Sequence, residues 1–283
     1  MSDALTVHAT TDAAVFMKGI ADLVDSEPVL TSVVATNAVR AIDDPQRFED
    51  PYWVWMEDPD ARPVAAAIHT PPHPPHLAAK DRAAGVALAD HLAESGRSIS
   101  GIGGMRPVAE AFADRWARLR ACRVKTTMHQ GVYEATAVTA PTAVPGSCRT
   151  STVSDVRLLN EWAQGFIADT GEPAPATEDA VTDKVVDGAM WLWEHDGESV
   201  SMAYASPPAG GVSRVSWVYT PPQHRRHGYA SAVVATVTQA QLDAGNRCML
   251  YTDLSNSTSN AIYQAVGYRR VGDAVALAFD DDS

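Results

Sequence analysis

The sequence predicts an α/β (α+β) protein of two domains, each with a mixed, mostly antiparallel sheet flanked by helices. Its length of 283 residues suits two ordinary domains. Short runs rich in apolar and β-branched residues alternate with longer runs whose apolar residues recur at helical spacing. A short Pro-containing segment, residues 140–147, lies near the middle and is typical of a linker. We therefore expect one domain over residues 1–140 and a second over residues 141–283.

The N-terminal half begins with helical spacing and then changes to strands. Phe16 and Ile20 lie one turn apart in a helix that Pro28 is expected to end. Pro107 suits the first turn of a later helix. In order, we expect a helix at 11–26, a helix or strand at 30–42, strands at 52–56 and 64–70, a helix at 78–95, a short strand and glycine-rich loop at 99–104, a helix at 107–119, and a strand pair at 122–138 around Gly131.

The C-terminal half repeats this alternation with clearer turn signals. Asp196-Gly197 between two apolar runs predicts a hairpin. Thr177, followed by two acidic residues, predicts a helix start. In order, we expect helices at 152–167 and 177–188, strands at 189–194, 199–206 and 215–220, a helix at 231–242, a strand at 248–254, a helix at 258–266, and a last strand at 268–279.

Bulk properties exclude several classes of function. The net charge of −13 argues against nucleic acid as a partner, because phosphate contacts need a basic face. No apolar run approaches 18 residues, so we expect no membrane span. The N-terminus lacks the basic start and long apolar core of a secretion signal. Three cysteines without a C-x-x-C pair argue against a disulfide framework and against a zinc site. We expect a cytoplasmic protein without a metal.

A basic, glycine-bearing segment joins the strand at 215–220 to the helix at 231–242. It reads Arg225-Arg226-His227-Gly228-Tyr229-Ala230. The first N–H groups of a helix have no partner within it and carry partial positive charge, so they bind anions such as a pyrophosphate. Gly228 lets the backbone turn and approach a ligand, and the arginines add cationic character. The two common nucleotide loops, G-x-x-x-x-G-K-[ST] and G-x-G-x-x-G, are both missing here.

Two motifs in the correct order give this segment a specific meaning. Arg225-x-x-Gly228-x-Ala230 matches the [Gln/Arg]-x-x-Gly-x-[Gly/Ala] signature of the GNAT superfamily of acyltransferases. Some 25 residues later, the run from Asn256 through Tyr263 to Gly267-Tyr268 is similar to that family's Asn-x-x-[Ala/Ser]-x-x-x-Tyr-x-x-x-Gly-[Phe/Tyr] segment. Residues 190–280 as a whole therefore resemble a GNAT domain.

The resemblance implies an N-acetyltransferase that moves an acyl group, most simply acetyl, from acetyl-CoA or another acyl-CoA to a primary amine in a ternary complex. It places the pantetheine arm along the strand before the loop, where the strand splays from its neighbour. Tyr263 becomes the general acid that protonates the leaving thiolate. The cofactor-binding residues implied are Val218, Tyr219, Thr220, Arg225, Arg226, His227, Gly228, Tyr229, Ala230 and Asn256.

Several assignments stay open at the level of sequence. Asn256 suits either the pantetheine arm or a helix N-cap, and Tyr263 suits either catalysis or a core. The loop strand has no carboxylate for a general base. The alternatives are Asp169, Glu172, Asp253, a chain of waters, or the loop histidines His224 and His227.

The N-terminal half carries a weak copy of the C-terminal pattern. Trp53-Val54-Trp55, an acidic turn and a run to Thr70 resemble Trp191-Leu192-Trp193, an acidic turn and a run to Ser206. No Arg-x-x-Gly-x-Ala loop accompanies the first copy, although Gly101 to Gly104 lie roughly where one is expected. The resemblance is therefore to a tandem GNAT protein with a degenerate N-terminal half. Such an internal pseudo-dimer would act as a monomer or a homodimer.

A second class of function competes with catalysis. The missing carboxylate favours a non-catalytic acyl-CoA-binding or regulatory module, whereas Tyr263 favours an enzyme. The acceptor is a small-molecule or peptide amine whose identity the sequence leaves open. The acidic body would favour a cationic amine, or serves only solubility.

Overall fold

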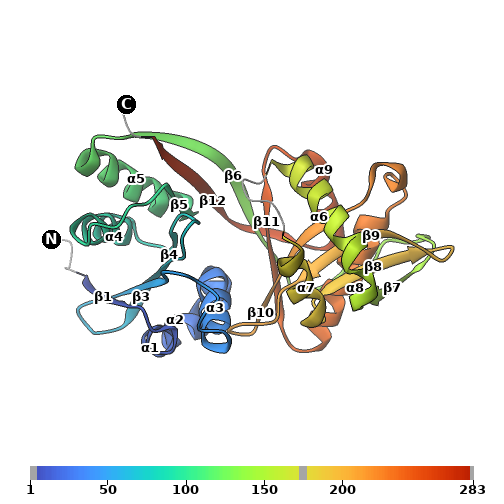
Figure 1. Ribbon diagram of the computed structural model, residues 1–283, viewed down its shortest axis with the longest axis horizontal. Coiled ribbons are helices and arrows are strands. Elements are labelled where there is room, and N and C mark those ends of the chain that lie inside the picture. The colour runs from blue at the N-terminus through green and yellow to red at the C-terminus, as the bar shows by residue number, and fades with distance from the viewer. Residues whose placement is uncertain (1–4, 172–176, 281–283) are drawn as a thin grey trace. The chain divides into compact units, whose positions relative to one another are not determined.

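The structure is a computed structural model that describes residues 5–171 and 177–280. These residues form two compact units (Figure 1). Unit 1 contains residues 5–132, 253–255 and 271–280, and unit 2 contains the rest of the described chain. None of the helices in this part of the chain combines the length and apolarity that a membrane span requires.

Unit 1 has a sheet in which neighbouring strands are mostly antiparallel. Strands β1 to β5 follow one another across it, and β4 and β5 are parallel. Next to β5 lies β12, from the far end of the sequence, and then β6 (Figure 1). The strands are β1 (Thr6–Thr10), β2 (Tyr52–Glu57), β3 (Pro63–His69), β4 (His76–Ala79), β5 (Gly101–Met105), β6 (Arg123–Ala135) and β12 (Arg269–Asp280).

Helices cover this sheet in two layers because side chains of β2 alternate between its faces. Val54 and Met56 pack with α4 and α5 in the core of the unit, whereas the Trp53 indole lies against Phe16 of α1 at 5.3 Å between ring centroids. The α4 and α5 helices lie side by side (Figure 1). The helices are α1 (Ala13–Gly19), α2 (Ala21–Ser26), α3 (Pro28–Asp43), α4 (Arg82–Glu94) and α5 (Arg106–Arg120).

Unit 2 repeats this plan. Its strands follow the order β7-β8-β9-β10-β11, with the end of β6 next, and β10 and β11 are parallel. The strands are β7 (Ser147–Thr150), β8 (Met190–His195), β9 (Glu198–Ala205), β10 (Val212–Tyr219) and β11 (Arg247–Asp253). The helices are α6 (Val156–Thr170), α7 (Glu178–Val186), α8 (Tyr229–Asp243) and α9 (Ser257–Val266).

The two faces of the β10 strand belong to different cores. Val215 and Val218 pack with α8 and α9, whereas Trp217 and Tyr219 pack with α6 and α7. A ligand that enters beside β10 from the α8 face therefore has the α6 and α7 helices on its other side.

The predicted fold class is confirmed, and the same order of elements occurs in both units. A hairpin (β2–β3 or β8–β9) precedes a parallel pair joined through one helix (β4-α4-β5 or β10-α8-β11), and another helix and a long strand follow. Each unit is completed by a strand whose residues come mainly from the other half of the sequence. The boundary at residue 140 stays a prediction. Residues 133–140 group with unit 2, and residues 271–280 group with unit 1.

Three local elements differ from those the sequence predicts. The helix expected at 11–26 is divided at Ile20 into α1 and α2; α2 ends at Ser26, before Pro28 as expected, and Pro28 also begins α3, since its missing N–H costs nothing in a first turn. Gly131 lies inside the single strand β6 and not at the turn of a strand pair. Gly101 to Gly104 form the strand β5 and not a loop. A Cβ on Gly101 would lie 2.1 Å from the Leu277 carbonyl oxygen, so close strand packing requires that glycine.

Candidate cofactor and catalytic site

The β10 strand is broken near its end. It pairs with β9 at Val215 and Ser216, and then again only at Tyr219, so two residues bulge out of the ladder. On its other side, the parallel ladder with β11 covers Val212 to Arg214. No further pair continues that ladder within the described residues. The last residues of β10 therefore present backbone groups to an open edge, which is the strand splay that the GNAT resemblance implies.

Unusual backbone conformations build this bulge and the loop after it. Trp217 has φ of 50° and Arg226 has φ of 69°. A bulky residue in the left-handed region is rare and costs about 1–3 kcal/mol, so it persists where the surroundings impose it. Nothing in the sequence signals the Trp217 conformation, because Gly, Asn and Asp are the residues that usually mark such positions.

The loop ends at the N-terminus of α8 without a side-chain cap. Gly228 is the N-cap residue with φ of 83°, and no side chain bonds to the helix there. A Cβ on Gly228 would lie 2.9 Å from Cγ2 of Val144. Glycine is thus required on two grounds, conformation and space. The backbone N–H groups that follow, from Tyr229 onward, are available to an anion.

The two arginines of the loop have different surroundings. The Arg225 Nε donates to the Thr220 carbonyl at 2.9 Å, and its guanidinium pairs with Asp169 at 2.5 Å and lies 5.8 Å from the Tyr219 ring centroid. This side chain fixes the loop to the end of β10 and to α6. Arg226 is exposed. The positive charge available to a phosphate therefore comes from Arg226 and the helix terminus more than from Arg225.

The remaining loop residues pack against the start of α8. The His227 ring stacks on Tyr229 with centroids 5.5 Å apart, and Nδ1 of His227 lies 3.2 Å from the His224 carbonyl oxygen. Tyr229 is buried at 5% exposure, so it anchors the helix start. Ala230, which follows it, is small enough for close approach of a ligand to the first turn.

The end of β10 is tied to the neighbouring strand by a side chain that the sequence did not reveal. The Ser201 hydroxyl donates to the Tyr219 carbonyl at 3.1 Å and lies 2.9 Å from the Thr220 hydroxyl. Ser201 is fully buried. Its separation from Thr220 in sequence hides the contact, which appears only once the β9–β10 hairpin forms.

Asn256 serves as the N-cap of α9. Its Oδ1 accepts from the Ser259 backbone N–H at 3.0 Å. Of the two roles expected from the sequence, the structure shows the helix cap. The amide nitrogen of the Asn256 side chain can still donate to a second partner. A role in holding an acyl-CoA remains a prediction.

Tyr263 lies on α9 and belongs to the same apolar cluster as Val218 at the end of β10 and Tyr229 at the start of α8. It is 9% exposed, and its ring meets Tyr268 edge-on at 6.0 Å. Burial raises the pKa of Tyr263 to about 12, which keeps the phenol protonated at neutral and moderately alkaline pH. Its role as a general acid remains a prediction.

Of the three carboxylates considered as a general base, two have a hydrogen-bond or ion-pair partner. Asp169 pairs with Arg225. The Asp253 carboxylate accepts from the Ser255 backbone N–H at 2.8 Å, and Glu172 lies outside the described residues. Burial raises the pKa of the Cys148 and Cys248 thiols to about 12, so both are poor nucleophiles.

Unit 1 lacks the corresponding loop. Only residues 80 and 81 join β4 to α4, against residues 220–228 between β10 and α8. The Asp81 carboxylate accepts from the Ala83 N–H at 2.8 Å and occupies the helix N-terminus. An acidic cap repels a phosphate from that position. This supports a degenerate N-terminal copy.

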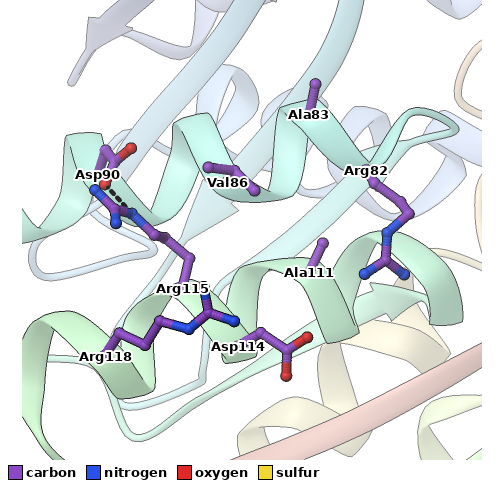
Figure 2. A pocket seen from close by; sticks show the side chains of 8 residues that line it. All are labelled: Arg82, Ala83, Val86, Asp90, Ala111, Asp114, Arg115 and Arg118. Atoms are coloured by element: carbon purple, nitrogen blue, oxygen red, sulfur yellow. Dashed lines mark hydrogen bonds and ion pairs between the residues drawn. The ribbon is translucent and has the colours of Figure 1, made fainter.

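Unit 1 does have a surface hollow of about 460 Å³ between α4 and α5 (Figure 2). Its charges are mixed, and Nε of Arg115 pairs with Asp90 at 2.6 Å across it. It lies on other elements than the predicted cofactor site. Its lining is Arg82, Ala83, Val86, Asp90, Ala111, Asp114, Arg115 and Arg118.

Comparison with known proteins shows which known fold this chain shares. A family described as FR47-like protein matches residues 198–276, which include the loop and the segment from Asn256 to Tyr268. Solved structures align over nearly the whole chain. A GCN5-related N-acetyltransferase from Sphaerobacter thermophilus covers 99% of this chain and 96% of its own, with a TM-score of 0.62 and 16% identity.

Two further structures share the full length. A Drosophila protein has a TM-score of 0.65 with 9% identity and covers 100% of both chains. A GNAT-family acetyltransferase from Colwellia psychrerythraea has a TM-score of 0.56 with 10% identity, covering 99% of this chain and 100% of its own. None of the curated proteins searched matches this chain. The chain has the GNAT superfamily fold.

The fold implied by the GNAT resemblance of the two motifs is thus confirmed, and three GNAT-fold or related structures align over nearly the whole chain. At such low identity, these structures establish the fold alone. No group of three or more metal-binding side chains gathers in residues 5–171 and 177–280. The chemistry of this GNAT fold therefore has to be argued from its own residues.

Proposed function

We propose that unit 2 transfers an acyl group, most simply acetyl, from an acyl-CoA to a primary amine. One observation carries the proposal: the open edge after the β10 bulge, the uncapped N-terminus of α8 and the Tyr263 side chain belong to one unit and border one apolar cluster. Each of the three suits a different part of an acyl-CoA.

The binding roles follow from the donors that are present. The α8 N-terminus, reached through Gly228, suits the pyrophosphate, with Arg226 adding charge beside it. The backbone of Val218, Tyr219 and Thr220 suits the amide groups of a pantetheine arm, which would lie along β10 as an added strand. Oδ1 of Asn256 caps α9, and its amide nitrogen is the part offered to the arm.

The chemical step needs a polarised carbonyl and a protonated leaving group. A backbone N–H of β10 at the bulge would stabilise the developing oxyanion. The amine nitrogen forms a bond to the carbonyl carbon, the carbon–sulfur bond breaks, and Tyr263 donates a proton or hydrogen bond to the thiolate. With a pKa of about 12, Tyr263 is a weaker acid than a thiol of about 8.5, so it acts mainly by donating a hydrogen bond to the thiolate, which then takes its proton from solvent.

The proton of the attacking amine has no carboxylate waiting on β10, whose residues include neither Asp nor Glu. We therefore assign that proton to solvent, and the acceptor reacts as the free amine. The rate should rise with pH through the pKa of the acceptor itself. A pH profile that moves with the acceptor, and not with the enzyme, supports this assignment.

Calorimetry with acetyl-CoA and thiol release with a panel of primary amines test the proposal. We expect one site per chain, lost in a Gly228→Asp variant, and CoA release that depends on the amine. Two sites would mean that unit 1 also binds. Absence of binding would overturn the proposal.

The second candidate is a non-catalytic acyl-CoA-binding or regulatory module, which the missing carboxylate on β10 favours. Under that reading, calorimetry would give the same binding, lost in Gly228→Asp, but no amine would release CoA. Binding and turnover therefore separate the two functions in one set of experiments.

A further inference from the structure

An ordered lysine lies on the face of β10 that is turned away from α8. Lys184 on α7 is the single lysine in residues 148–283. Its Nζ lies 4.5 Å from the ring centroid of Trp217 and 5.5 Å from that of Tyr204, and it donates to the Ala180 carbonyl at 3.0 Å. Cation–π contacts of this geometry favour the charged ammonium. The side chain thus holds a positive charge directly over the bulge residue.

Further aromatic rings lie next to Trp217 and Tyr219. Phe166 of α6 lies 6.4 Å from Trp217 between ring centroids, and Trp162 lies 6.5 Å from Tyr219. Trp162 is buried, whereas Phe166, Trp217 and Tyr219 are each partly exposed. The partly exposed rings form an apolar surface beside the Lys184 ammonium.

This surface lies where the second substrate has to approach. The proposed pyrophosphate site is at the start of α8, and α8 packs on the face of β10 that carries Val215 and Val218. The amine must then reach the carbonyl from the opposite face, which carries Trp217 and Tyr219. The attacking amine needs free space on one side of the acyl group. On the α8 side, the side chains of α8 pack against β10 and occupy that space.

Resting on the function proposed above, we propose that Lys184, Trp217 and Phe166 bind the acceptor, and that the acceptor is a small primary amine bearing a carboxylate and an aromatic or apolar side chain. The ammonium attracts a carboxylate and repels a dication. Residues 148–283 hold nine Lys or Arg against 17 Asp or Glu, so a positive charge is the less common kind in this half of the chain. An acidic body would draw in polyamines, but the fixed charge over Trp217 opposes them at the point of reaction.

The test compares acceptors that differ by one group. Acetyl-CoA is supplied with phenylalanine, with phenethylamine, which lacks the carboxylate, and with alanine, which lacks the ring; rates are compared per unprotonated amine. We expect kcat/KM for phenylalanine to exceed that for each of the other two by about 10-fold or more, the difference lying mainly in KM. Equal kcat/KM values for phenylalanine and phenethylamine would overturn the inference and leave the proposed function intact.

The variants assign the preference to the lysine. Lys184→Met keeps the alkyl chain against Trp217 and removes the charge, so it should raise KM for phenylalanine about 10-fold and leave phenethylamine unchanged. Lys184→Arg should restore most of the preference. A Lys184→Met variant that folds, judged by its melting temperature, and keeps the preference would overturn the assignment. If the wild-type chain binds no acetyl-CoA in calorimetry, the proposed function fails first, and this inference falls with it.

Discussion

Gly228 and Gly245 lie at the two ends of α8 with nearly the same backbone, φ of 83° and 82°. They differ in what surrounds them. A Cβ on Gly228 would meet Val144, whereas a Cβ on Gly245 would meet nothing within 4 Å. Comparing substitutions at these two glycines therefore separates the effect of a left-handed backbone from the effect of steric crowding at the proposed phosphate site.

We predict that Gly228→Ala lowers acetyl-CoA affinity by about 10-fold or more, because the loop must shift from the α8 N-terminus to admit the methyl group. Both Gly228→Ala and Gly245→Ala should lose about 1 kcal/mol of unfolding free energy from the left-handed backbone. Calorimetry and denaturant unfolding of the two variants check this. Equal loss of affinity in Gly245→Ala would contradict a local role for the loop.

Tyr263 and Tyr268 are neighbouring buried phenols with different partners. The Tyr268 hydroxyl lies 2.8 Å from the Thr238 hydroxyl in the core, and no hydrogen bond to the Tyr263 hydroxyl occurs among the described residues. We predict that Tyr263→Phe lowers kcat about 100-fold with acetyl-CoA affinity unchanged. Tyr268→Phe should instead cost about 1 kcal/mol of stability with kcat retained. Steady-state kinetics would contradict the assignment if the two variants exchanged these effects.

At the scale of elements, ion pairs and caps fix where helices begin. The Arg149 guanidinium on β7 contacts both carboxylate oxygens of Asp155, at 2.7 and 2.9 Å, and Glu194 on β8 at 2.8 Å. The Thr152 backbone N–H also donates to Asp155. Together these contacts join β7 and β8 to the turn that starts α6.

The carboxylate of Asp155 makes stability depend on acid. The Arg149 hydrogen bonds hold its pKa at about 2, below the ordinary value of 3.8. A depressed pKa adds stability that is present above pH 4 and is lost as pH falls toward 2. We predict that Asp155→Asn lowers the unfolding free energy by roughly 1–2 kcal/mol at pH 7, after allowance for solvent screening, and flattens the pH dependence between 4 and 2. Urea unfolding across that range measures both.

The Asn256 side chain permits a separation of capping from binding. Asp is as good an N-cap as Asn but lacks the amide donor. We predict that Asn256→Asp keeps the melting temperature, whereas Asn256→Ala loses about 1 kcal/mol. If the amide binds an acyl-CoA, Asn256→Asp also weakens acetyl-CoA binding in calorimetry. Unchanged affinity would leave Asn256 with the cap alone.

For the molecule as a whole, the β12 strand makes the N-terminal unit depend on the C-terminal end of the sequence. Leu277 of β12 is 6% exposed in the core of unit 1, and Ala274 to Ala278 pair with β5. Val271 of the same strand is 52% exposed. Residues almost at the end of the chain thus stabilise a unit built mainly from its beginning.

We predict that Leu277→Ala destabilises unit 1 by about 2–5 kcal/mol, whereas Val271→Ala changes little. Hydrogen exchange should report the loss at β5 and β4, far away in sequence. The outcome that would contradict this is a loss of protection confined to unit 2.

The sequence by itself determined the fold class and the locations of the motifs, because these depend on local signals. Arg225 and Gly228 at a strand-to-helix turn are readable from their neighbours alone, and so is the Asn256 to Tyr263 spacing on one helix. The weak repeat of the two Trp-bearing hairpins can also be detected from the sequence, since apolar residues alternate along a strand whose two faces differ in burial.

Only the tertiary structure decided which strands complete each unit and which contacts the site residues make. Local signals do not encode that β12 lies beside β5, that Ser201 holds the end of β10, or that Arg225 is engaged by Asp169. The glycines at 101–104 read as a loop from composition, and close packing against β12 makes them a strand instead. These outcomes depend on pairs of residues distant in sequence, whose contact energies exist only after the chain has folded.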